Sequence, residues 1–168
     1  MYLENFQVKA NWRIPAIFIA LLIPISYFNT LLFHTLIEGF AIIVAILTFM
    51  AAFNTYKYSQ THFLMFVGCG YFWVALLDFL HTISFSSMSV FPDVHEGVTI
   101  QFWIWARMFE AGILLSFTRY IHRPVNINWA FFGIGGLFVL ITFATFAGWM
   151  PVLFSNETGL SDTKIYAE

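Results

Sequence analysis

The chain has 168 residues, of which 60% are hydrophobic, 21% aromatic and only 10% charged, and its formal net charge is −2. A soluble domain carries about 25% charged residues, so this composition excludes an ordinary soluble protein. The small net charge and the lack of a basic patch give no reason to expect a nucleic-acid partner. The single cysteine, Cys69, excludes an intrachain disulfide. We therefore predict an integral membrane protein whose first partner is the lipid bilayer.

The apolar runs, taken in chain order, predict an all-α fold: a polytopic transmembrane helix bundle of about five spanning helices. A span needs about 20 apolar residues, and the first run, which contains Pro15 and Pro24, is short for one. A turn is expected at residues 29–30 and a polar loop at residues 54–61. We treat residues 1–168 as a single transmembrane domain. The predicted spans cover residues 14–30, 31–53, 62–83, 98–118 and 127–150.

Ionisable side chains occur in three of these predicted spans, the second, third and fourth. Their spacings of three or four residues place each group on one helix face. An ionisable side chain at mid-membrane costs about 2.5–3.5 kcal/mol on insertion scales, and such residues are functional candidates by default. The candidate ligand-binding residues are His34, Glu38, Asp78, His81, Trp103, Arg107 and Glu110.

The charges of the loops predict the orientation of the bundle. Lys9, Arg13, Lys57, Arg119 and Arg123 fall on one side, and the positive-inside rule places that side, with the N-terminus, in the cytoplasm. The ionisable residues of the spans then lie in the outer half of the membrane. Five spans would leave the C-terminal end outside, which is unusual for a membrane anchor or a sensor whose output lies inside the cell. We therefore expect the bundle to be truncated from a longer one.

The charges of the candidate site do not cancel. Three acids and one arginine sum to −2 when the histidines are neutral. We expect Arg107 to form a bidentate pair with one carboxylate, that of Asp78 or of Glu110. The remaining carboxylates need protons, imidazolium partners or a bound cation. This excess of negative charge favours a site that holds more than a structural ion pair.

Three uses of the site remain open. A transition metal such as zinc would bind to His34 and His81, with Glu38 and Asp78 as carboxylate ligands. A b-type haem would take the two histidines as its axial ligands. A pH or small-ligand sensor would need no cofactor, because histidine titrates near neutrality. The pair His34 and Glu38, and likewise the pair Asp78 and His81, is by itself more often structural than ligating, so only the combination of all six ionisable residues favours a functional site.

Three segments resemble a known family. Residues 33–38 (Phe-His-Thr-Leu-Ile-Glu), residues 77–82 (Leu-Asp-Phe-Leu-His-Thr) and the pattern Trp103-x-x-x-Arg107-x-x-Glu110 are similar to the third class of bacterial membrane-associated sensor domains, the MASE group. The resemblance implies a multi-helix input domain in the bacterial inner membrane. Such domains precede cytoplasmic histidine kinase, PAS or diguanylate cyclase modules. In this sequence the output module and the family's later spans are missing, although residues 159–165 resemble the lead-in to a further span.

The site and the resemblance together predict a sensory input domain, not an enzyme. It would detect a ligand, a metal, the redox state or pH. It would signal to a histidine kinase or diguanylate cyclase module, in two-component or cyclic-di-GMP signalling. A second copy of the chain could be a further partner, in a homodimer. The alternative is a haem- or metal-binding membrane redox protein or enzyme. A transporter would show inverted repeats or paired discontinuous helices, and the sequence has neither.

Overall fold

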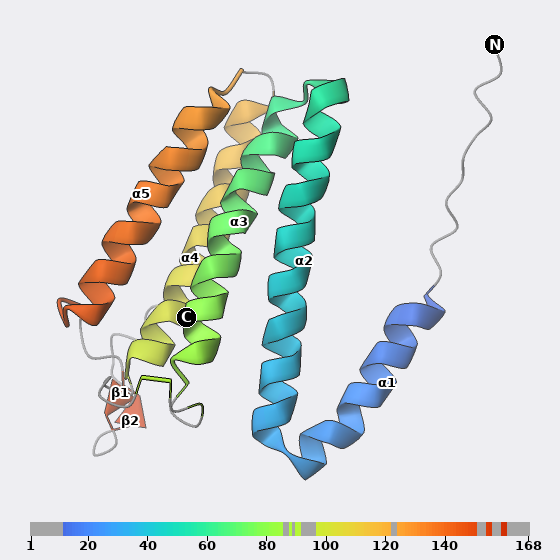
Figure 1. Cartoon of the computed structure of the whole chain (residues 1–168), viewed down its shortest axis with the longest axis vertical. Helices are drawn as coiled ribbons and strands as arrows, with labels where there is room; N and C mark the ends of the chain where they lie inside the picture. The colour runs from blue at the N-terminus through green and yellow to red at the C-terminus, as the bar shows by residue number, and fades with distance from the viewer. Residues whose placement is uncertain are drawn as a thin grey trace. The chain divides into compact units, whose positions relative to one another are not determined.

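The computed structural model describes residues 12–85, 88, 90–91, 97–121, 124–150, 154–155 and 159–160. The helices in this part of the chain confirm the predicted all-α fold (Figure 1). Two short strands, β1 (Phe154–Ser155) and β2 (Gly159–Leu160), pair antiparallel after the last helix. The helices are α1 (Arg13–Phe28), α2 (Thr30–Ser59), α3 (His62–Ile83), α4 (Gly97–Tyr120) and α5 (Ile127–Phe146).

Four of the described helices, α2 to α5, are long and apolar enough to cross a membrane. Helix α1 has 16 residues, which rise by about 24 Å at about 1.5 Å per residue. The hydrocarbon core of a bilayer is about 30 Å thick. The first of the five predicted spans is therefore a shorter apolar helix, with Pro24 inside it.

Helix α2 is longer than the sequence predicted. It continues to Ser59, so the loop predicted for residues 54–61 is wrong over residues 54–59. These residues are polar, but none of them is a proline or glycine that breaks a helix. The positive charge of Lys57, in the last turn, also interacts favourably with the negative end of the helix dipole. The chain leaves the helix at Gln60, which has a φ of 50°.

Helix α5 is shorter than predicted, because it ends at Phe146 and not near residue 150. Gly148 has a φ of 69°, a conformation that glycine adopts without steric cost. The backbone N–H of Trp149 donates to the carbonyl of Ala144 at 3.0 Å, and that of Gly148 donates to the carbonyl of Thr145 at 3.2 Å. These two bonds form a Schellman motif, so Gly148 ends the helix before the chain reaches Pro151.

The chain divides into two compact units, Met1–Leu36 and Ile37–Glu168. The first unit contains α1 and the start of α2. Between these helices, the side-chain oxygen of Asn29 accepts a hydrogen bond from the backbone N–H of Leu32 at 2.9 Å. This is the geometry of a helix N-cap, and it confirms the turn predicted at residues 29–30.

The second unit has a core in which α3 packs with α4 and α5. Val74 and Leu77 of α3 are buried with Phe102 and Ala106 of α4 and Ile141 of α5. Figure 1 shows these three helices side by side. In a bilayer, lipid tails are as apolar as these side chains, so close packing contributes more to helix association than removal from water does.

Small residues make this close packing possible. A Cβ atom added to Gly68 of α3 would lie 2.5 Å from the Cβ of Ala52 in α2. A Cβ at Gly135 of α5 would clash with the Trp73 ring of α3, whose Nε1 donates to the carbonyl of Phe131 at 3.0 Å. Gly68 and Gly135 therefore mark two places where neighbouring helices approach closely.

Some of the sequence predictions concern residues outside the described part of the chain. Lys9 and Arg123, two of the residues that predict the orientation, lie outside it, and only the backbone of Arg119 is described. Most of the predicted lead-in to a further span, residues 161–165, also lies outside it.

Candidate functional site

Arg107 of α4 joins two acidic side chains from two helices. Its Nη2 donates to both carboxylate oxygens of Asp78 in α3, at 2.8 Å each. Its Nη1 donates to Oε2 of Glu110, one turn further along α4, at 2.6 Å. The Asp78 side chain is 4% exposed and that of Arg107 is 42% exposed. The predicted ion pair is therefore present, and the guanidinium serves both acids.

Tyr71 extends this network along α3. Its hydroxyl donates to Oε1 of Glu110 at 3.0 Å, so Glu110 receives hydrogen bonds from both α3 and α4. Our reading of the sequence missed Tyr71, although it lies seven residues before Asp78. That spacing is two helical turns and places both side chains on the same face of α3, which is a signal that could have revealed it.

His81 connects the end of α3 to the start of α4 and to α2. Its Nδ1 lies 2.8 Å from the carbonyl oxygen of Thr99. A carbonyl only accepts hydrogen bonds, so Nδ1 carries the proton and donates it. The Nε2 atom lies 4.0 Å from Oε1 of Glu38, and the two side chains are 8% and 17% exposed. This separation is too long for a direct hydrogen bond.

Thr99 was also missed, since a backbone carbonyl leaves no trace in a sequence. Its hydroxyl donates to the carbonyl oxygen of Ser84. The carbonyl and the hydroxyl of Thr99 therefore connect the start of α4 to the end of α3, and the carbonyl orients the His81 ring.

Five of the predicted residues thus make two groups in the second unit, and we call them together the charged site. Trp103 lies on α4, one turn before Arg107, and is half-buried. His34 lies on α2 in the first unit, and its role as a ligand stays a prediction. The two groups of the charged site are Glu38 with His81, and Asp78 with Arg107 and Glu110.

The comparison with protein families decides what kind of protein this is. The model of the MASE3 family, described as a membrane-associated sensor domain, matches residues 25–168. The chain belongs to this family. No curated protein and no solved structure matches the chain.

The match of the sensor-domain family covers helices α2 to α5 and all seven predicted site residues. It begins in the last turn of α1. Membership confirms the resemblance that three short segments indicated, and it agrees with the four long apolar helices in making the chain a membrane protein. It favours a sensory role over an enzymatic one.

Proposed function

We propose that this sensor domain is a membrane-embedded sensory input domain that detects a ligand, a metal, the redox state or pH at the charged site. We further propose that the site lies in the outer half of the membrane and signals to a cytoplasmic histidine kinase or diguanylate cyclase module. The observation that supports this best is the convergence of charged side chains from α2, α3 and α4 on one part of the bundle.

The charge of the site favours a positively charged signal. The carboxylates of Asp78 and Glu110 contact the guanidinium of Arg107, and the carboxylate of Glu38 lies near His81. The sum is −2 when His81 is neutral and −1 when it is protonated. Because charges interact strongly in a medium of low dielectric constant, a proton or a metal cation would be drawn to the Glu38–His81 gap.

Such a signal would alter the forces between helices. A unit charge on His81, about 4 Å from the Glu38 carboxylate, interacts with it by about 4 kcal/mol at an effective dielectric constant of about 20, less the cost of desolvation. A switch between mostly inactive and mostly active states needs about 5.5 kcal/mol. The pair between α2 and α3 would therefore supply part of the free energy that such a switch needs.

The geometry of His81 supports the metal version in particular. Metal-binding histidines usually donate their second ring N–H to a carbonyl or a carboxylate, which fixes the tautomer. His81 does this with Thr99, and its Nε2 faces Glu38. Asp78 is a weaker candidate ligand than we predicted, because both of its oxygens contact Arg107. The haem version needs His34 as the second axial ligand.

Metal analysis and a visible spectrum of the purified protein in lipid nanodiscs test these versions. A metal bound at a one-to-one ratio and lost in Glu38→Gln and His81→Ala would support a metal signal, and a Soret band lost in His34→Ala would support haem. His62→Ala is the matched control, since His62 bonds to the hydroxyl of Tyr56 and does not belong to the charged site. If neither metal nor haem is found, a proton or small-ligand signal remains, and hydrogen exchange of α2 to α4 between pH 5.5 and 8 tests it.

We also propose that the protein lies in the bacterial inner membrane with its N-terminus in the cytoplasm. Labelling of single cysteines in intact cells tests this orientation, in a background where the buried Cys69 is replaced by alanine. A membrane-impermeant maleimide should label Tyr27→Cys, at the end of α1, and spare Ser59→Cys, at the end of α2. The opposite pattern would reverse the orientation and place the charged site in the cytoplasmic half.

A further inference from the structure

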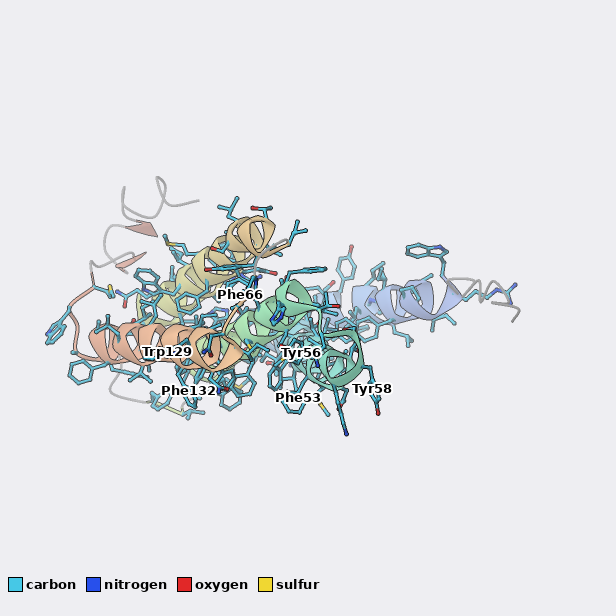
Figure 2. The ribbon with its side chains drawn as sticks, turned by 90° about the horizontal axis from the view of Figure 1, so that it is seen from above. Phe53, Tyr56, Tyr58, Phe66, Trp129 and Phe132 are labelled. Carbon is cyan, nitrogen blue, oxygen red and sulfur yellow. The ribbon has the colours of Figure 1, made fainter. Side chains whose placement is uncertain are left out.

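A cleft lies between the end of α2, the start of α3 and the start of α5, away from the charged site. It has a volume of about 370 Å³, within the range of about 300–1,000 Å³ that is typical of ligand pockets. A smaller hollow of about 230 Å³ adjoins it and shares Asn126 and Asn128 with it. Figure 2 shows the bundle from this end, with Phe53 and Tyr56 labelled on α2.

The cleft has an apolar wall and a polar rim. Phe53 of α2, Met65 of α3 and Ile127 of α5 line the wall, and the amides of Asn126 and Asn128 line the rim. The side-chain oxygen of Asn126 accepts a hydrogen bond from the backbone N–H of Trp129 at 3.2 Å, which holds this amide at the N-terminus of α5. The lining therefore suits a ligand with an apolar part and a polar part.

The surroundings of the cleft indicate that the bilayer covers it. Phe53 is 61% exposed, Trp129 is 78% exposed and Phe132 is 70% exposed, and Figure 2 shows the last two on α5. Exposed aromatic side chains at the ends of apolar helices are typical of the membrane–water interface. The molecules that border a cleft at this level of a membrane protein are phospholipids.

Charge favours an anionic lipid over a neutral one. The sequence has no aspartate or glutamate between residues 39 and 77 or between residues 111 and 156, so no acid lies on the segments that line the cleft. Lys57 is exposed and lies four residues after Phe53, on the same face of α2. The N-terminus of α5 adds the positive end of a helix dipole.

We propose that this cleft binds one anionic phospholipid from the adjacent leaflet. An acyl chain packs against Phe53, Met65 and Ile127, and the phosphate headgroup lies near Lys57 and the amide of Asn128. The cleft lies between α2 and α5, so a bound lipid stabilises the packing of these two helices, which the charged site does not connect.

Native mass spectrometry of the purified chain with added phosphatidylglycerol or phosphatidylcholine tests the proposal. We expect one phosphatidylglycerol to be retained in preference to phosphatidylcholine. Asn128→Phe, which fills the mouth of the cleft from an exposed position, should abolish this retention. Asn54→Phe is the matched control, because Asn54 is exposed near the same end of α2 but does not line the cleft.

Lys57→Gln changes one exposed charge and keeps the proposal testable if Asn128→Phe fails to fold. It should weaken phosphatidylglycerol retention by about fivefold, the usual effect of one basic residue on anionic lipid, and leave phosphatidylcholine unaffected. Equal retention of both lipids by the wild-type chain would overturn the proposal. Undiminished retention by a folded Asn128→Phe, or an equal loss in Asn54→Phe, would also overturn it.

Discussion

The charged site and the cleft accommodate polar groups in a membrane protein by different means. In the charged site, carboxylates from three helices meet one guanidinium and one imidazole, and Asp78 is almost fully buried. In the cleft, the polar groups of the lining are the amides of Asn126 and Asn128 and the phenol of Tyr56, and Lys57 is exposed nearby on α2. Charges within the apolar part of a membrane need partners inside the protein, whereas groups at the interface can meet water and lipid headgroups. Substitutions in the charged site should therefore affect the fold strongly, and those at the cleft should affect it weakly.

The largest effect is expected from Arg107→Ala, which leaves Asp78 and Glu110 without their guanidinium partner. Breaking a buried ion pair costs about 3–5 kcal/mol, and we expect about 3 kcal/mol because the Arg107 side chain is 42% exposed. Chemical unfolding in detergent measures the change in the free energy of unfolding. Lys57→Ala is the matched control near the cleft, and it should cost less than about 0.5 kcal/mol. Equal losses for the two variants would show that the charged site is no more important for stability than the cleft.

The next largest effect is expected between the two regions, where α2 and α3 approach each other. Gly68→Ala would place its Cβ 2.5 Å from that of Ala52, and overpacking of this kind costs about 1–3 kcal/mol. Gly136→Ala is the control, because it is helical and has no atoms within 4 Å of an added Cβ in the described structure. It should be neutral or slightly stabilising. A stable Gly68→Ala variant would show that the helices can separate without cost.

A smaller loss of stability is expected from Tyr71→Phe in the charged site. It removes the hydroxyl that donates to Glu110 at 3.0 Å, and hydrogen bonds to charged groups contribute about 1.5–3 kcal/mol. We expect a loss of about 1.5 kcal/mol, at the low end of this range, because Glu110 keeps its bond to Arg107. In the Arg107→Ala background the loss should be larger, since Tyr71 is then the remaining described donor to Glu110. Strict additivity in this double-mutant cycle would contradict a shared network.

The smallest effect is expected at the rim of the cleft. Asn126→Ala removes the side-chain oxygen that accepts the Trp129 N–H, and loss of an N-cap costs about 1 kcal/mol. Asn126→Asp keeps the acceptor and should retain most of the stability. A loss as large as that of Arg107→Ala would mean that the cleft, and not the charged site, stabilises the bundle.

The fold and much of the charged site could be predicted from the sequence. Apolar runs predicted four of the spans, and helical spacing placed Asp78 with His81 and Arg107 with Glu110 on common faces. Helix ends were less predictable. The polar residues 54–59 resembled a loop but continue α2, because polarity does not by itself end a helix and tertiary contacts override local preference. Gly148 ends α5 through a backbone conformation with a positive φ, which the sequence does not display.

From the amino-acid sequence alone we could predict a helical membrane protein, its resemblance to the membrane-associated sensor domains, and the ionisable residues of its spans. These properties depend on composition and on spacing along one helix, which are local. The folded structure was needed to show that Arg107 contacts both acids, that Tyr71 and the Thr99 carbonyl complete the network, and that a cleft opens between α2 and α5. Such contacts depend on how each helix is rotated against its neighbours, and that rotation is set by packing between residues far apart in the chain, such as Gly135 and Trp73.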